Sequence, residues 1–251
     1  MYVVSFFNIK GGVGKTTSTV NYAACLSEKD KKILVIDLDP QANATKSFNC
    51  YSIDNLCTTD VLLEKELSIK EVIKHTEYNN IDMLPSNITL AAADRSILTD
   101  VSRSQQNRLS KALNEVKNDY DYVLIDCPTT LNTVTINAMV ASDDIVVPLK
   151  IDKYALDGLE LVLNNIEEVK QEFNEKLNFK GVLVTMDRNT RVNTQIKDVL
   201  KDQLGDKLLK TTIRNTNAVN ESTFDVPLVF SNKKSTASVD YQKSTEEIFN
   251  I

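Results

Sequence analysis

The chain has 251 residues, of which 42% are apolar and 25% are charged, and this composition excludes a disordered or fibrous protein. No apolar run approaches the roughly 18–20 residues that span a bilayer, so the sequence predicts no membrane-spanning segment. From the cysteines and the C-terminal residues discussed below we expect a cytoplasmic protein with no membrane partner. The net charge of −6 argues against a protein that simply coats nucleic acid.

Short apolar runs alternate along the chain with longer segments in which apolar residues recur every three or four positions. The runs, rich in Val and Ile, predict buried strands at 2–7, 33–36, 81–84, 122–125, 145–149 and 182–186, and a weaker one at 208–213. The periodic segments predict helices at 16–29, 103–117, 134–141, 156–173 and 192–204. This order predicts an α/β fold, with a mostly parallel twisted β-sheet flanked by helices on both faces, in one domain over residues 1–251.

The chain offers little for thiol, imidazole or zinc chemistry. Its four cysteines form no C-x-x-C pair and fit no zinc spacing, which favours reduced thiols in the cytoplasm. Its only histidine, His75, lies in a polar stretch of helical character and is expected to be exposed to solvent. A Ser-His-Asp or Cys-His enzyme would depend on that one residue, so we expect neither.

Three of the six glycines, Gly11, Gly12 and Gly14, follow the first predicted strand and open the first predicted helix. In that position a glycine-rich loop turns its backbone N–H groups toward phosphates, and the helix N-terminus adds positive partial charge. Lys15 then supplies a full charge to the phosphates, and the hydroxyl of Thr16 is placed to ligate Mg²⁺. The sequence therefore predicts that ATP and Mg²⁺ bind here and that ATP is hydrolysed.

The loop departs from the usual pattern G-x-x-x-x-G-K-[ST], because Ile9 occupies the first glycine position and Lys10 adds a second lysine. KGGVGKTT (10–17) is the deviant Walker A motif, and here the chain resembles the ParA/MinD family of P-loop ATPases. The resemblance implies that Lys10 reaches across a homodimer interface to the partner's nucleotide, which would make ATP binding and dimerisation one event. It assigns nucleotide binding to Lys10, Gly11, Gly12, Val13, Gly14, Lys15, Thr16 and Thr17, and catalytic roles to Lys10 and Lys15.

Carboxylates follow two further predicted strands. The segment DLDPQANAT (37–45) resembles the family's switch I, in which the second aspartate, here Asp39, is tied to hydrolysis and Asp37 would lie nearer the Mg²⁺. A carboxylate near the γ-phosphate can orient or deprotonate the attacking water. The segment YVLIDCP (122–128) has the Walker B arrangement, in which Asp126 holds Mg²⁺ through water. Thr129 stands where the family usually has a second proline, so this switch II segment is expected to differ in flexibility.

The resemblance covers residues 1 to about 249 and is loose only at 48–100. VPLKIDKYALDGL (147–159) and VLVTMDRNTRVN (182–193) match family segments, and the second of these ends in a basic turn. IRNTNAVNESTFDVP (213–227) resembles the segment near the adenine and the DNA, which implies that Arg214 and Asn215 bind the nucleotide.

Three branches of the family use such a loop: ParA-type partition ATPases, MinD-like membrane-binding ATPases, and the nitrogenase iron-protein or anion-pump branch. The C-terminal residues 238–251 hold three acids and one lysine, whereas an interfacial helix needs a basic polar face. Cys127 has no second cysteine in a glycine-rich loop with which to hold an iron–sulfur cluster, and burial as a small apolar residue is expected. We therefore favour a ParA-type ATPase, and a MinD-like or cargo-positioning ATPase that does not act on DNA is the alternative.

The ParA interpretation predicts plasmid or chromosome partition, in which the ATP-bound dimer binds duplex DNA without sequence preference. Non-specific binding depends on cations that neutralise phosphates. The candidates are Arg188, Arg191, Lys210, Arg214, Lys233 and Lys234. Residues 1–180 carry 19 Lys and Arg against 26 Asp and Glu, and this acidic part could receive the basic segment of a ParB-type or equivalent centromere-binding partner that stimulates slow hydrolysis. We expect nucleoid association in the ATP-bound form and no separate N-terminal DNA-binding domain.

Overall fold

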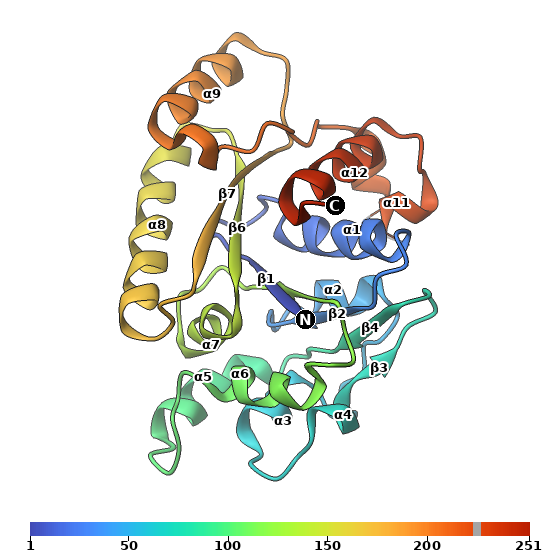
Figure 1. Ribbon diagram of the computed structural model, residues 1–251, viewed down its shortest axis with the longest axis vertical. Helices are drawn as coiled ribbons and strands as arrows, with labels where there is room; N and C mark the ends of the chain where they lie inside the picture. Colours follow the sequence, from blue (N-terminus) through green and yellow to red (C-terminus); the bar gives the residue numbers. More distant parts are fainter. Residues whose placement is uncertain (223–226) are drawn as a thin grey trace.

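The centre of the molecule is a β-sheet that has seven strands in the residues described by the computed structural model, 1–222 and 227–251 (Figure 1). The strands are β1 (Tyr2–Phe6), β2 (Ile33–Asp37), β3 (Lys74–His75), β4 (Ile81–Leu84), β5 (Tyr122–Asp126), β6 (Asp144–Lys150) and β7 (Asn178–Thr185). Their order in space is β3-β4-β2-β5-β1-β6-β7, and every neighbouring pair is parallel except β3 with β4. This arrangement confirms the predicted mostly parallel α/β fold.

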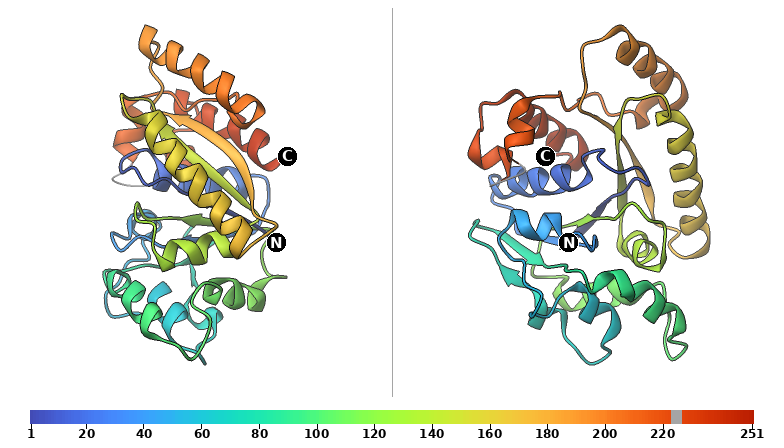
Figure 2. Two further views of the ribbon diagram at one scale, coloured as in Figure 1. Left: turned by 90° about the vertical axis from the view of Figure 1, so that its left-hand side faces the viewer. Right: turned by 180° about the vertical axis from the view of Figure 1, so that it is seen from behind.

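Helices cover both faces of the sheet (Figures 1 and 2). One face carries α1 (Lys15–Ser27), α2 (Asn43–Ser47), α10 (Asn217–Ser222), α11 (Leu228–Ser231) and α12 (Thr236–Phe249). The other face carries α3 (Thr58–Leu63), α4 (Ile69–Val72), α5 (Leu90–Thr99), α6 (Arg108–Leu113), α7 (Thr133–Ala141), α8 (Ala155–Glu172) and α9 (Arg191–Leu204), with single 3₁₀ turns at Asn114–Val116 and Gly205–Lys207. In the described residues we find no helix of the length and apolar character needed to cross a membrane.

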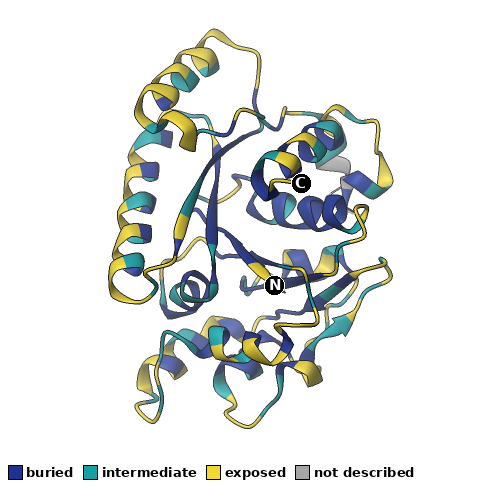
Figure 3. Cartoon of the chain, viewed as in Figure 1, coloured by how far each residue is buried: buried dark blue, intermediate teal, exposed yellow. Residues whose placement is uncertain are grey.

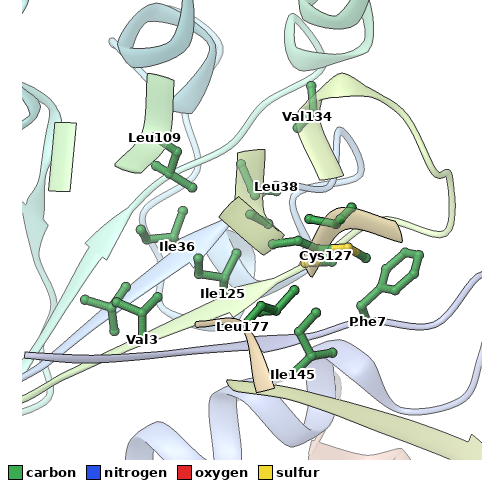
Figure 4. Close-up of a cluster of buried hydrophobic side chains, with 14 of the residues drawn as sticks. Val3, Phe7, Ile36, Leu38, Leu109, Ile125, Cys127, Val134, Ile145 and Leu177 are labelled. Carbon is green, nitrogen blue, oxygen red and sulfur yellow. The ribbon is translucent and has the colours of Figure 1, made fainter. Parts of the chain in front are cut away.

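Successive residues of each strand point to opposite faces, so the central strands contribute to two hydrophobic cores. Val3 belongs to the core under α5 to α8, whereas Val4 belongs to the core under α1 and α12. Figure 3 shows the central strands buried along most of their length, and Figure 4 shows the first core, which includes Phe7 and the side chain of Cys127. Burial on both faces explains why the strand sequences are continuous apolar runs rather than alternating ones.

The weak strand expected at 208–213 does not form, and that prediction was wrong. Leu208 makes an isolated bridge to Val182, and the backbone N–H of Leu209 donates to Val182 O at 3.0 Å. In the next two residues, the backbone N–H groups of Lys210 and Thr211 donate instead to the carboxylate of Glu247 on α12, at 2.7 and 3.1 Å. A side chain of the neighbouring helix therefore satisfies the donors that a strand ladder would have used.

Two helix predictions also need correction. The polar stretch that contains His75 is helical only as far as Val72, and Lys74–His75 pairs with β4, although the expected exposure of His75 is confirmed. The helix expected at 103–117 begins at Arg108, because the amide oxygen of Asn137 on α7 accepts from the backbone N–H groups of Arg108 and Leu109 at 2.8 and 3.2 Å. This tertiary cap fixes the start of α6 and is invisible to local periodicity.

Candidate functional site

The glycine-rich loop connects the end of β1 to the start of α1, as the sequence predicts. Gly12 and Gly14 adopt left-handed backbone conformations, with φ of 67° and 85°, that disfavour any residue with a Cβ. Thr185 at the end of β7 supports the loop from behind, because its hydroxyl donates to the carbonyl of Val13 at 2.8 Å. Gly14 caps α1 without a side chain, so the first backbone N–H groups of the helix remain available to an anion.

Lys15 is a buried cation at the start of α1. Its Nζ donates to the carbonyl of Lys10 at 3.2 Å across the loop. Burial lowers the pKa of Lys15, while the nearby carboxylates of Asp126 and Asp39 favour its charged form. A bound polyphosphate would compensate the same desolvation, so this lysine sits where a phosphate stabilises it.

Two carboxylates lie side by side at the carboxyl ends of β2 and β5, because Asp37 and Asp126 are register partners. Thr16 donates its hydroxyl to Asp126 Oδ2 at 2.6 Å, while Asp126 Oδ1 is buried and has no hydrogen-bond partner within the described part of the chain. Burial and the neighbouring Asp37 carboxylate raise the pKa of Asp126 well above its usual range. An orphaned buried oxygen beside a second carboxylate and a hydroxyl is the donor set that Mg²⁺ prefers.

No cluster of three His, Cys, Asp or Glu side chains that could hold a metal ion occurs in residues 1–222 or 227–251. Mg²⁺ usually keeps several waters and binds through one or two carboxylates plus substrate phosphates. The residues present therefore fit Mg²⁺ held jointly by the protein and a nucleotide.

Asp37 holds the turn that follows β2. Its carboxylate accepts from the backbone N–H groups of Asp39 and Thr45, both at 2.9 Å, and from the Thr45 hydroxyl at 2.8 Å. Burial raises the pKa of Asp37 to about 6, although these donors act in the opposite direction. Both oxygens are thus already engaged within the protein, which suits a role next to Mg²⁺-bound water.

Asp39, in the turn after β2, lines a cavity that lies beside the glycine-rich loop. Its Oδ1 accepts from the backbone N–H of Gln41 at 2.8 Å, and its carbonyl accepts from the Ser86 hydroxyl at 2.8 Å. The turn that carries it includes Ala42 in a left-handed conformation, with φ of 55°. Asp39 is therefore placed on a short, locally constrained segment that faces the glycine-rich loop.

Lys10 does not line the cavity in this structure. Its ammonium forms an ion pair with the carboxylate of Asp152, two residues past the end of β6. The hydrogen bond and the positive charge of Lys10 hold the pKa of Asp152 below its usual value. Sequence reasoning missed Asp152, which is 142 positions away from Lys10.

The cavity beside the loop has a volume of about 640 Å³. From the predicted loop, Gly11, Gly12, Gly14, Lys15, Thr16 and Thr17 line it. The sequence analysis did not assign the further lining residues to the site, namely Val20 and Asn21 on α1, Asn43, Lys46 and Ser47 on α2, and Met186 and Pro227. Gln41, Asn49 and Thr129 also line the cavity. Helix α2 spans five residues, too few for periodicity to reveal it.

A smaller hollow adjoins the cavity and shares Gly14, Thr17 and Met186 with it. Arg214 and Asn215, which the resemblance assigns to the nucleotide, line this hollow. The guanidinium of Arg214 is paired with Asp240 of α12 through its Nε and Nη2, at 2.9 and 2.7 Å. With its amide oxygen turned to the guanidinium of Arg188, Asn215 accepts from Nε and Nη2 at 2.9 and 3.1 Å. Of the similar segment 213–227, residues 223–226 lie outside the described residues.

The six candidate DNA contacts do not form one cluster. Arg188 contacts Asn215 beside the N-terminal end of α1, whereas Lys233 pairs with Glu28 just past the C-terminal end of the same helix. A helix of 13 residues is about 20 Å long, so these two cations are well separated. Arg191, Lys210 and Lys234 are exposed.

Comparison with known proteins agrees with this geometry. The profile of a family described as an AAA domain matches residues 1–179. The chain is 37% identical over 249 residues to the sporulation initiation inhibitor protein Soj of Bacillus subtilis, covering 98% of this chain and 97% of that protein. Its fold resembles that of a cobyrinic acid a,c-diamide synthase from Mycobacterium smegmatis with bound ATP analogue and magnesium, at 28% identity, a TM-score of 0.86 and coverage of 100% and 95% of the two chains. It also resembles a Borrelia burgdorferi protein assigned to plasmid partition and bound to AMPPNP, at 26% identity, a TM-score of 0.81 and coverage of 99% and 98%.

Proposed function

Because this chain belongs to the Soj/ParA family of partition ATPases, we propose that it couples ATP hydrolysis to the partition of plasmid or chromosomal DNA. The observation that carries the proposal is the meeting of three features at one edge of the sheet. These are a glycine-rich loop at a helix N-terminus, the buried Lys15, and the Thr16–Asp126 pair with its orphaned oxygen. Together they supply hydrogen-bond donors for a triphosphate and ligands for its Mg²⁺.

The residues of the site have separate roles. Lys15 and the N–H groups at the start of α1 bind the β- and γ-phosphates. Thr16 and Asp126 would hold Mg²⁺, which would neutralise charge that develops on the phosphates, and Asp37 would orient water beside it. Asp39, which lines the same cavity, positions the attacking water and accepts its proton.

The ATP-bound protein forms a homodimer in which Lys10 leaves Asp152 and reaches the nucleotide of the other copy. The dimer binds duplex DNA without sequence preference, and a ParB-type or equivalent centromere-binding protein stimulates hydrolysis and releases it. The family resemblance at Lys10 supports dimerisation, and the exposure of Arg191, Lys210 and Lys234 supports a role in phosphate contacts.

Binding and hydrolysis are tested separately. Lys15→Ala should weaken ATP–Mg²⁺ binding about 10- to 150-fold in calorimetry, because a hydrogen bond to a charged group contributes about 1.5–3 kcal/mol. Lys29→Ala, at the exposed end of α1, is the control and should bind ATP normally. Asp39→Ala should keep ATP binding but lower the hydrolysis rate about 10²- to 10⁴-fold. Normal hydrolysis by Asp39→Ala would remove this residue from the mechanism.

DNA attachment is tested on the dimer that Asp39→Ala traps with ATP. It should bind duplex DNA of unrelated sequences equally, and the affinity should fall steeply with salt. The same protein with ADP is the control and should bind much less. If the trapped dimer fails to bind DNA even at low salt, the partition role is wrong and a cargo-positioning ATPase is favoured.

A further inference from the structure

Asp187, two residues past β7, has a buried carboxylate that joins two separate parts of the molecule. It follows Met186, which lines the nucleotide cavity. On one side it accepts from Lys197 Nζ at 2.6 Å and from Asn193 Nδ2 at 3.2 Å, both on α9. On the other side it accepts from the Thr212 hydroxyl at 2.9 Å. Its side chain is only 8% exposed, so these partners replace water.

The backbone of Asp187 binds the same second part. Its N–H donates to the carbonyl of Ile213 at 2.9 Å, and its own carbonyl accepts from the N–H of Asn215 at 2.9 Å. Asn215 and Met186 both line the hollow next to Thr17. Residues 212–215 and the end of β7 are therefore held together as one wall of the nucleotide site.

Helix α9 is attached to the protein by a narrow apolar stripe and by its two bonds to Asp187. Of its fourteen residues, all of which are described, Leu200 alone is buried, and Val192 is 60% exposed. The helix lies at one end of the molecule, beyond the main helical layers (Figures 1 and 2). Ile196 and Leu204 are half-buried and pack with Leu200 against the core, while the bonds from Asn193 and Lys197 to Asp187 hold the N-terminal half of the helix.

Met186 links the nucleotide cavity to Asp187, because it lines the cavity and immediately precedes Asp187 in the chain. It has a left-handed backbone, with φ of 50°, and this narrow well is unfavourable for a residue with a side chain. A nucleotide that contacts Met186 would therefore meet a backbone with little freedom to rotate locally, and a displacement there would reach the adjoining Asp187.

We propose that Asp187 is a positioning residue that couples occupancy of the nucleotide site to the orientation of α9, which begins at Arg191, and of Arg188 in the loop before it. The inference rests on the proposed nucleotide binding and DNA attachment, and it names the regulated element. The carboxylate remains ionised at neutral pH, since burial raises its pKa but Lys197, Asn193 and Thr212 together bring it below its usual range. The ionised form is the one that binds all three donors.

The test compares Asp187→Asn with Asp198→Asn, an exposed acid on the same helix. Hydrogen exchange of the α9 amides is measured with and without ATP–Mg²⁺, together with ATP affinity, dimerisation and affinity for a DNA duplex. In the wild type and in Asp198→Asn, ATP should change the exchange rates of α9. In Asp187→Asn that change should be lost and DNA binding weakened about 2- to 30-fold, while ATP affinity and dimerisation stay within about twofold.

The outcomes separate the inference from the proposed function. An ATP-induced change at α9 that persists in Asp187→Asn overturns the coupling role, and so does a loss of ATP affinity equal to the loss of DNA affinity. A wild-type protein that binds ATP but not DNA overturns the partition role, whereas the exchange measurement still decides the coupling. If Asp187→Asn does not fold, Thr212→Val removes one donor from the same carboxylate and should reduce the ATP-induced change. A full change in that variant would also overturn the inference.

Discussion

Lys10 and Asp152 form an ion pair that links the loop after β1 to the segment after β6. The lysine expected to serve the other copy's nucleotide is thus engaged within its own chain, and under the proposed mechanism this contact would have to break when a dimer forms. Both side chains are about one-third exposed, so the pair is screened by water and its contribution is modest.

Asp152→Asn should therefore favour the ATP-dependent dimer. The expected gain in dimer affinity is about twofold to fivefold, the equivalent of an exposed ion pair of up to about 1 kcal/mol. Sedimentation of the ATP-bound protein over a range of concentrations measures it, with Asp157→Asn on the exposed surface of α8 as the control. A weaker dimer in Asp152→Asn would mean that this carboxylate has a partner in the dimer as well.

Arg214 carries two alternative roles that a single substitution separates. Its partner Asp240 is nearly buried, with a side chain 6% exposed, whereas Arg214 is 54% exposed. Arg214→Met should lower the free energy of unfolding by about 1–3 kcal/mol, because it leaves a buried carboxylate short of donors. Urea unfolding measures this, and Lys210→Met, an exposed cation nearby in sequence, is the control.

If Arg214 instead contacts DNA phosphates, Arg214→Met should leave stability unchanged. It should then reduce the slope of log affinity against log salt by about one. The bidentate pair with Asp240 favours the first outcome.

Lowering the pH from about 6 to about 4 should change the stability of the protein and its Mg²⁺-dependent ATP affinity in opposite directions. The pKa of Asp37 is raised by burial from 3.8 to about 6, so between these values the folded state binds more protons than the unfolded state. The free energy of unfolding of the nucleotide-free protein should therefore rise as the pH falls from about 6 to about 4. Over the same range Mg²⁺-dependent ATP affinity should fall, because protons compete with the cation for the carboxylates.

Urea unfolding and calorimetry at pH 7 and 5 measure both quantities. Carboxylates with lowered pKa values, such as Asp152, have the opposite effect on stability. Their stabilising contribution is lost only when the pH falls to the ordinary carboxylate pKa or below it. In Asp37→Asn the acid-side gain in stability should shrink. A nucleotide-free wild type that becomes steadily less stable from pH 6 to 5 would contradict the assignment.

Substitution of two glycines by alanine should change the stability of the protein in opposite directions. A Cβ at Gly181 in β7 would lie 2.5 Å from the carbonyl oxygen of Lys207, a backbone atom held in place by the adjoining bond from Leu209 to Val182. Gly181→Ala should cost about 1–3 kcal/mol of stability, as overpacking does. Gly158→Ala in α8 meets no atom within 4 Å and should add about 1 kcal/mol, because alanine is the better helix former. Thermal unfolding of the two variants checks both signs.

The parts of the fold that follow from local sequence could be predicted, and the parts that depend on distant contacts could not. Six strands and the helices α1, α7, α8 and α9 lie where apolar runs and periodicity place them. The start of α6 depends on Asn137, and the absence of a strand at 208–213 depends on Glu247, a residue of the last helix. Local patterns carry no information on either contact.

The candidate site shows the same division. The glycine-rich loop, Lys15 and Thr16 could be identified because they are contiguous in the chain, and Asp126 because it ends an apolar strand run. Asp152, Asp187 and Asp240 could not, because the partner of each is set by tertiary folding. A lone aspartate is a common surface residue, and nothing near it in the sequence distinguishes a buried one.

The sheet has edges that are closed to further pairing. At one edge, β3 is only two residues long and carries Lys74 and His75, which gives another strand almost nothing to bind. At the other edge, β7 already accepts from the N–H groups of Leu209 and Ile213 at its outer side, at 3.0 and 2.8 Å. Within the residues that the structure describes, neither edge therefore offers a long unpaired strand that a second copy could extend. The dimer proposed above would then have to form through another surface, such as the face at the carboxyl ends of the strands, and its assembly would depend on the molecule that occupies that face.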